Sequence, residues 1–137
     1  MRNKLVVLAC LFFGAVATTH AQAGGVKVRV PFQFSVGDKV LPAGEYVVWP
    51  DHNLVLLRAA DGKIAATAQA NHGEPDGGKS AKVIFHCYER QCYFSGFWNP
   101  ENEIARETPR SKAETELAKH GEIQVFALLG EASSRSR

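Results

Sequence analysis

Two cysteines separated by four residues are the most reactive pair in the chain. Cys87 and Cys92 lie among β-branched and aromatic residues, whereas the third cysteine, Cys10, lies in the apolar N-terminal stretch. A redox pair usually has the Cys-x-x-Cys spacing at the start of a helix, where the pKa of a thiol is lowered. The wider spacing within a β-rich segment instead favours a structural disulfide between Cys87 and Cys92.

Four histidines follow residue 23, and none has the spacing of a zinc-ligand pair. The nearest approach to a metal site is His72 with Glu74 and Asp76, in a glycine-rich segment whose composition is also that of a solvated loop. His86 is best explained as a cross-strand aromatic partner of Tyr93, and a role as general base is the weaker alternative. We therefore assign no metal, cofactor or catalytic residue from the sequence.

The sequence does not indicate a serine nucleophile. Ser35, Ser80 and Ser95 lack the Gly-x-Ser-x-Gly sequence of a nucleophile elbow, and so does Ser111, which is expected to cap a helix. One alternative hypothesis is a small secreted hydrolase or metal-dependent enzyme. It requires the polar residues around His72, or those around His86, to converge in one pocket.

Aromatic residues are the strongest candidates for a binding role. Five of them lie at or near the ends of predicted strands: Trp49, Tyr88, Tyr93, Phe97 and Trp98. Strict alternation places Tyr93 and Phe97 on the face opposite Phe85 and Phe94. If no other element covers that face, it forms an apolar surface for a protein, a glycan or a small apolar ligand. The alternative is that both faces pack inside the domain.

These residues need a sheet to position them, and the clearest strand pattern covers residues 26–36. Its even positions are all valine or phenylalanine, and its odd positions are Lys, Arg, Pro, Gln and Ser. Such alternation is typical of a strand with one buried and one exposed face. Residues 45–49, 54–58 and 63–70 have the composition of further strands, and turn-forming residues separate them.

Residues 82–88 and 91–98 are predicted to form a hairpin around Glu89 and Arg90. A two-residue loop pairs Cys87 with Cys92 at a non-hydrogen-bonded position, where the Cα atoms of an antiparallel pair are closest. His86 then faces Tyr93. A disulfide at this position closes a very short loop, so its main effect is to fix the strand register.

One helix is indicated near the C-terminus. Ser111 and Glu114 form a capping-box pattern, and Gly121 is placed to end the helix. So short a helix is unstable alone, so its apolar residues Ala113, Leu117 and Ala118 are expected to dock on the sheet. We predict an all-β domain, an antiparallel β-sandwich or small barrel of about seven or eight strands with one short C-terminal helix.

Residues 1–23 have the pattern of a secretory signal peptide. Arg2 and Lys4 precede an apolar core, and Ala21-Gln22-Ala23 supplies the small-x-small cleavage pattern. The apolar run is shorter than the roughly 20 residues of a membrane span. Cleavage leaves a single β domain at 24–130 and a flexible tail at 131–137. We predict an exported periplasmic or extracellular protein with no integral membrane span after cleavage.

The charge balance argues against nucleic acid as a partner. The formal net charge of the chain is +2, and Arg2 and Lys4 account for all of it because the leader has no acidic residue. The remaining domain is formally neutral. A neutral domain lacks the basic surface with which proteins bind phosphate backbones.

Two stretches resemble a group of small exported bacterial proteins of the acidobacterial type. The shared pattern is Pro-Phe-x-Phe-x-Val-Gly followed by Leu-Pro-Ala-Gly-x-Tyr-x-Val, and this chain meets it at residues 31–37 and 41–48. A third similar segment is residues 106–114. The resemblance implies a β-rich fold and export. The group has no assigned activity, so the resemblance implies no site residues, and the cysteine pair departs from its pattern.

Three functional hypotheses remain after these observations. The first is a non-catalytic envelope or extracellular module that binds a protein, a glycan or a small apolar ligand through the five aromatic residues. The second is the small hydrolase or metal-dependent enzyme. The third is a structural or assembly subunit, which would show a contact between copies of the chain instead of a concave site.

Overall fold

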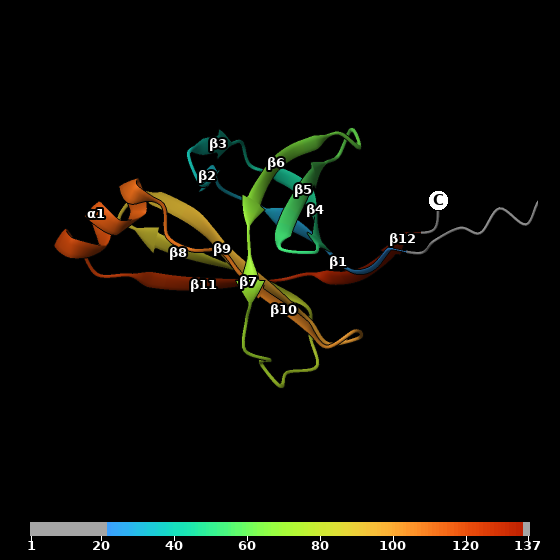
Figure 1. The fold of residues 1–137 in the computed structure, drawn as a ribbon. Coiled ribbons are helices and arrows are strands. Elements are labelled where there is room, and N and C mark those ends of the chain that lie inside the picture. The colour runs from blue at the N-terminus through green and yellow to red at the C-terminus, as the bar shows by residue number, and fades with distance from the viewer. Residues whose placement is uncertain (1–21, 136–137) are drawn as a thin grey trace, which may run out of the picture.

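A computed structural model of the chain describes residues 22–135 (Figure 1). Twelve strands and one helix follow one another in this order: β1 (Gln22–Val30), β2 (Phe34–Val36), β3 (Lys39–Leu41), β4 (Gly44–Asp51), β5 (Leu54–Ala59), β6 (Ile64–Gln69), β7 (Asn71–His72), β8 (Lys82–Tyr88), β9 (Gln91–Asn99), β10 (Ile104–Glu107), α1 (Lys112–His120), β11 (Gln124–Leu129) and β12 (Glu131–Arg135). The predicted all-β class with a short C-terminal helix is confirmed. The strands are more numerous than predicted because several are only two or three residues long.

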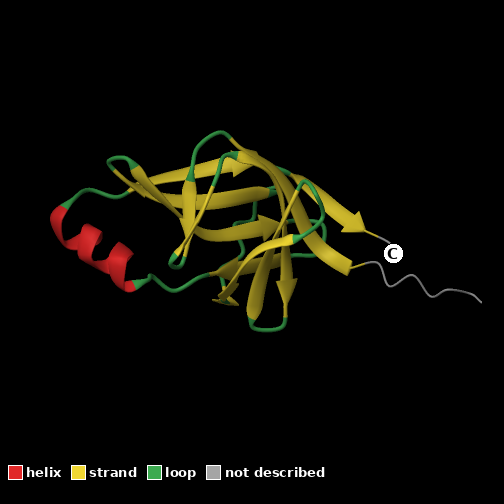
Figure 2. Ribbon diagram, turned by 90° about the horizontal axis from the view of Figure 1, so that it is seen from above, coloured by secondary structure: helices red, strands yellow, loops and turns green. Residues whose placement is uncertain are grey.

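The strands form two sheets that enclose one core. One sheet has the order β12-β1-β4-β5-β6, and the other has the order β11-β8-β9-β10-β7, with the short β2 paired to β9 and the short β3 paired to β2. Nearly all pairs are antiparallel; the contact of β2 with β9 at Ser35 and Tyr93 is parallel. The architecture is that of a β-sandwich whose sheets curl, with α1 at one end of the molecule (Figure 2).

The alternation at residues 26–36 is confirmed, although one strand becomes two. Val26, Val28 and Val30 of β1 are buried, and the lysine and arginine between them are exposed. The ladder breaks at Pro31, which has no N–H to donate to a neighbouring strand. After this break the chain enters the other sheet as β2, where Phe34 and Val36 are again buried. The same alternating pattern thus contributes to both walls of the core.

Aromatic rings fill the centre of that core. Phe85 of β8 is fully buried, and its ring centroid lies 5.2 Å from that of Phe32, 5.3 Å from that of Phe34 and 6.2 Å from that of Phe94. All three contacts are edge-to-face, an arrangement that places the positive edge of one ring on the negative face of another. Phe34 makes a fourth such contact with Tyr46, at 5.2 Å.

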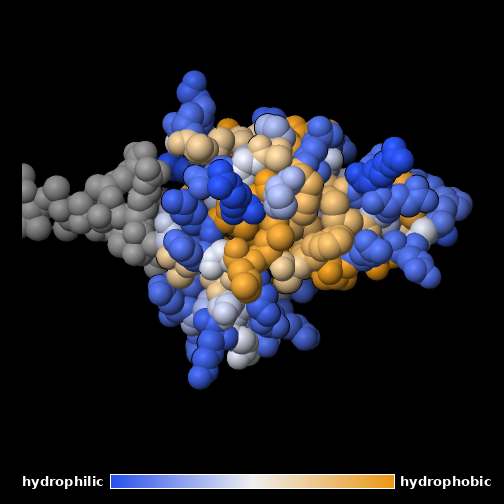
Figure 3. All heavy atoms as spheres, turned by 180° about the vertical axis from the view of Figure 1, so that it is seen from behind, coloured by the Kyte–Doolittle hydropathy of each residue, from blue (hydrophilic) through white to orange (hydrophobic). Residues whose placement is uncertain are grey.

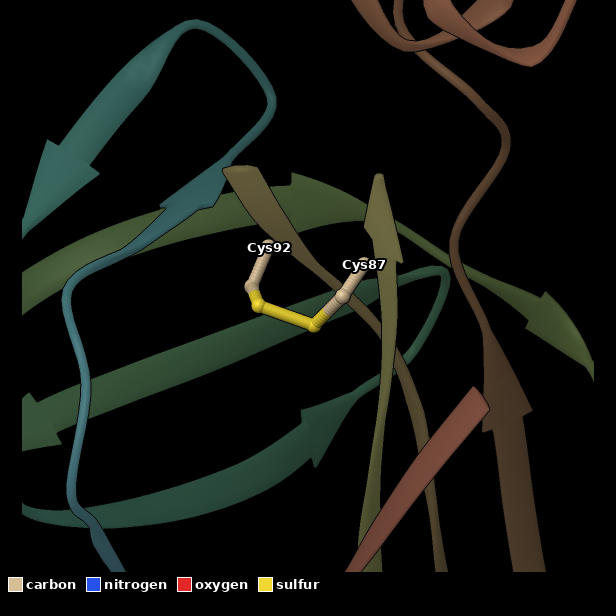
Figure 4. The surroundings of a disulfide bond; sticks show 2 residues. All are labelled: Cys87 and Cys92. Carbon is tan, nitrogen blue, oxygen red and sulfur yellow. A yellow bond between two sulfur atoms is a disulfide. The ribbon is translucent and has the colours of Figure 1, made fainter. Parts of the chain in front are cut away.

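The β8–β9 hairpin has the predicted register. Tyr88 pairs with Gln91, Cys87 with Cys92 and His86 with Tyr93. The two cysteines form a disulfide with Cα atoms 4.0 Å apart, as expected for a non-hydrogen-bonded pair (Figure 4). The disulfide lies at the loop end of the hairpin and holds the two strands in this register.

A β-bulge in the same hairpin overturns the predicted placement of Phe97. The register shifts between Ile84 and Phe85, where Ser95 is the additional residue of β9. Beyond a bulge the alternation of side chains is reversed. Phe97 therefore faces the core beside Phe94 instead of the outer face beside Tyr93. Sequence alternation alone does not reveal such an insertion.

The C-terminal segment differs from the flexible tail expected at 131–137. Residues 131–135 form β12, which pairs with β1 through Lys27 and Glu131 and through Val26 and Ala132. β11 and β12 are separated only by Gly130, whose N–H donates to the carbonyl of Ala81. The chain thus passes directly from the edge of one sheet to the edge of the other. The predicted signal peptide lies almost entirely outside the described residues, apart from its last two positions.

The helix α1 begins as predicted but docks differently. The Ser111 hydroxyl accepts from the backbone N–H of Glu114 at 3.1 Å, and the helix ends one residue before Gly121. Ala113 is exposed and Leu117 is only half-buried, so apolar side chains do not anchor the helix. Glu114 is the buried residue of α1. Within residues 22–135, no helix has the length and apolar character to cross a membrane.

Candidate functional site

The five aromatic residues predicted to bind a ligand are all buried, and they do not form one face. Their exposed fractions range from 1% to 6%: Trp49, Tyr88, Tyr93, Phe97 and Trp98. Phe97 belongs to the core. The ring of Trp49 occupies the space that a side chain at Gly25 would need. The expected exposed aromatic surface is therefore absent.

The remaining three aromatic residues are held by polar contacts under other elements. Trp98 donates from Nε1 to the carbonyl of Gly78 at 2.9 Å, and Tyr88 donates to Glu114. Tyr93 packs edge-to-face against Tyr88 with ring centroids 6.0 Å apart. The loop after β7 thus covers one end of the outer face of the β8–β9 hairpin, and the helix α1 covers the other end. The alternation of side chains in the sequence had left open whether this face is exposed.

The histidine and acidic residues of the loop at 71–80 do not converge. His72 lies beside Arg106, with Nδ1 3.3 Å from a guanidinium nitrogen, and Asp76 forms an ion pair with Lys82. No group of three or more potential metal ligands occurs among residues 22–135. The hypothesis of a metal-dependent enzyme that uses His72, Glu74 and Asp76 has no support from this arrangement.

The structure instead gathers polar groups around Glu114, beneath α1. Glu114 is 4% exposed, and its carboxylate accepts a hydrogen bond from the Tyr88 hydroxyl at 2.7 Å and lies 3.8 Å from Arg110 Nε. The same oxygen lies 3.4 Å from His86 Nδ1. A buried carboxylate is costly unless it is hydrogen-bonded and paired. These contacts, rather than apolar packing, attach the helix to the β8–β9 hairpin.

Ser95 adds a further contact, to the other ring nitrogen of His86. The hydroxyl of Ser95, in the bulge of β9, lies 3.3 Å from His86 Nε2. A carboxylate beside Nδ1 favours the tautomer with its proton on that nitrogen, and Nε2 is then free to accept the serine proton. The order Ser95, His86, Glu114 is that of a nucleophile, a general base and an orienting carboxylate.

The pocket beside Glu114 does not present this serine to a substrate. A pocket of about 420 Å³ opens beside Glu114 and is also lined by Tyr93, Thr108, Lys39 and other residues, but not by Ser95 or His86. A nucleophile needs a site in which the reacting atom is held close to it. The main role of the contacts around Glu114 is therefore to attach the helix α1 to the sheet. Catalysis by Ser95 and His86 would require a substrate bound on the outer face of the sheet.

Burial, together with the hydrogen bond to the negatively charged Glu114, raises the pKa of Tyr88 from its usual 10 to about 12. The folded state thus favours the neutral phenol. Its contribution to the free energy of unfolding is complete below pH 10 and is lost as the pH rises from 10 to about 12.

We expect Tyr88→Phe to remove this alkaline step. Ultraviolet absorbance of tyrosinate, measured as a function of pH, should lose its highest-titrating component, whereas Tyr46→Phe should leave that component in place. Survival of the highest-titrating component in Tyr88→Phe would contradict its assignment to Tyr88.

Among residues 22–135, the two most exposed large apolar residues, Leu129 and Val125, lie on β11, and Phe126 of the same strand is also exposed. The exposed fraction is 63% for Val125, 44% for Phe126 and 74% for Leu129, and β11 contains no charged residue. Figure 3 shows a broad apolar patch on one face of the molecule, surrounded by hydrophilic surface. Edge strands of stable monomers are usually blunted by lysine, proline or a bulge. β11 has none of these features.

β11 is also a sheet edge whose backbone groups point in two directions. Among the strands within residues 22–135 it pairs with β8 alone, at one end of the strand order, as Figure 1 shows. Gly130 donates its N–H to the carbonyl of Ala81, so these two residues form a hydrogen-bonded pair at the end of the ladder. This pair determines which residues of β11 direct their backbone groups to β8. In an antiparallel pair, alternate residues direct their N–H and C=O groups to the neighbour. Phe126 and Leu128 therefore face β8, and Val125, Ala127 and Leu129 face outwards.

Neither the open edge of β11 nor the group of contacts around Glu114 was predicted as a site from the sequence. Glu114 was interpreted as half of a capping box, and the strand at 124–129 lacks the alternation that marks one buried and one exposed face. An uncharged run of apolar residues close to the C-terminus was the available signal for an open edge.

Comparison of the chain with protein-family models, with curated proteins and with solved structures finds no match. The function is therefore inferred from the geometry of β11 and of the Glu114 contacts.

Proposed function

We propose that the protein is an exported, non-catalytic binding module that receives an extended strand of a protein partner on the open edge of β11. The observation that carries the proposal is the outward-facing backbone of Val125, Ala127 and Leu129 beside exposed apolar side chains. Strand addition to such an edge gains main-chain hydrogen bonds, and alternate side chains provide selectivity.

Two further observations support export. The Cys87–Cys92 disulfide belongs to the type of crosslink that persists in oxidising compartments outside the cytosol. The N-terminal sequence has the basic, apolar and small-residue regions of a secretory leader. An exported binding module of this kind uses the rigid sandwich to present β11.

The test is a titration with a short soluble peptide of alternating valine and threonine that ends in lysine. We expect backbone amide shifts in the NMR spectrum to concentrate at Val125, Ala127 and Leu129. Ala127→Pro should abolish them, because it removes an outward N–H while leaving the ladder to β8 intact. Shifts confined to the pockets, or equal binding by Ala127→Pro, would contradict the proposal.

A second candidate function, hydrolysis of an ester, is favoured by the contacts of Ser95 with His86 and of His86 with Glu114. In this reaction Ser95 Oγ attacks the carbonyl carbon while His86 Nε2 takes the hydroxyl proton and later returns it to the leaving alcohol. Water then releases the acid from the serine.

A fluorophosphonate probe distinguishes this candidate from a purely structural role. A reactive Ser95 should form a covalent phosphonyl adduct that mass spectrometry locates on its peptide, and His86→Ala should slow adduct formation by about 10²-fold or more. Absence of the adduct in the folded protein would remove the candidate and leave the contacts around Glu114 as a helix anchor.

A further inference from the structure

We infer that the strand received by β11 is the β11 strand of a second copy of this chain, paired antiparallel about a two-fold axis at Ala127. This inference rests on the proposed function, because it names the partner of the same open edge. Three residues of β11 direct their backbone groups outwards: Val125, Ala127 and Leu129. They are spaced symmetrically around Ala127.

This symmetry makes the edge complementary to itself. With the axis at Ala127, Val125 of one copy lies opposite Leu129 of the other, and the two Ala127 residues face each other. All three positions then form hydrogen-bonded pairs, so every outward N–H and C=O in this set finds a partner. A two-fold interface requires the same patch on both subunits to fit itself.

The sizes and charges of the β11 side chains are compatible with this register. Alanine is the smallest side chain among the three and lies where two copies of the same residue meet, whereas the larger valine and leucine of opposite copies lie side by side. β11 has no charge that would meet its own copy. Glu122 and Glu131 lie beyond the two ends of β11, outside the paired segment, so like charges do not face each other in the strand pair.

The pairing also covers apolar surface that is exposed in the isolated chain. Val125 and Leu129 are 63% and 74% exposed, and Phe126 is 44% exposed beside Phe32, with ring centroids 6.4 Å apart. A pair of six-residue strands covers less than the roughly 1,600 Å² of a standard stable interface. We therefore expect a dimer that dissociates on dilution.

Single-cysteine crosslinking tests the register. Cys10→Ser removes the one cysteine outside the native disulfide, and each variant then carries one free thiol. Under mild oxidation Ala127→Cys should give a covalent dimer, because the Cα atoms of a hydrogen-bonded pair are about 5.5 Å apart, within disulfide reach. Val125→Cys alone should not, because the two copies of that residue lie about 13 Å apart along the pair.

A mixture of Val125→Cys and Leu129→Cys provides the matched control, because this register predicts crosslinks between the two variants but not within either one. Crosslinking of Val125→Cys with itself as readily as Ala127→Cys would overturn the register. Sedimentation of the chain as a monomer at all concentrations, with no Ala127→Cys dimer, would overturn the inference. In that case binding of the valine–threonine peptide at β11 decides whether the proposed function survives without self-association.

Discussion

Replacing Phe85 with alanine is expected to lower the free energy of unfolding by about 3–5 kcal/mol. The ring is fully buried and packs edge-to-face on Phe34 and Phe94, which belong to the same sheet as Phe85, and on Phe32, which lies between β1 and β2. A cavity at this point removes all three contacts at once. Because small domains are stable by only about 5–15 kcal/mol, the loss is a large fraction of the total. Urea unfolding measures it.

Phe126→Ala provides the matched control for this substitution. Phe126 lies directly opposite Phe85 in the β8–β11 pair, but 44% of its surface is exposed. We expect its replacement to cost about 1 kcal/mol or less when the protein is dilute enough to be monomeric. Equal losses for the two variants would contradict the assignment of Phe85 to the core and Phe126 to its margin.

Glu114→Ala is expected to cost about 2–3 kcal/mol and to release α1 from the sheet. Its removal leaves the buried Tyr88 hydroxyl without an acceptor, and it removes the partner of Arg110 and His86. The nine-residue helix has too few apolar contacts to remain docked without this anchor. Amide hydrogen exchange along α1, together with urea unfolding, should show both effects.

The control on the same helix is Glu116→Ala. Glu116 is 66% exposed and forms an ion pair with Lys119 at 3.1 Å. Exposed pairs of this type contribute about 0.5 kcal/mol or less. Similar losses for Glu114→Ala and Glu116→Ala would show that the contacts beneath the helix do not stabilise the fold.

The parts of the fold that depend only on local sequence patterns were predicted correctly. The valines and phenylalanines of residues 26–36 are buried as their alternation indicated, and the two-residue loop at Glu89 and Arg90 was sufficient to place Cys87 opposite Cys92. Both inferences use only period-two geometry and turn length. They needed no information about distant segments.

The features that were missed depend on contacts between distant segments. The bulge at Ser95 reverses the face of Phe97, and residues 131–135 form a strand because β1 offers a free edge. Glu114 is buried because Tyr88, 26 residues earlier, lies beneath the helix. The predicted aromatic binding face failed for the same reason: the loop after β7 and the helix α1 cover its ends, which alternation within one hairpin cannot indicate.

The proposed function requires that one backbone side of β11 is bonded to β8 and that the other side is open to a second strand. Amide hydrogen exchange resolved by residue measures the two sides separately, because they alternate along the strand. In dilute protein we expect fast exchange at Val125, Ala127 and Leu129 and slow exchange at Phe126 and Leu128, with the fast set becoming protected as the concentration rises. Equal protection of both sets in dilute protein would contradict this requirement.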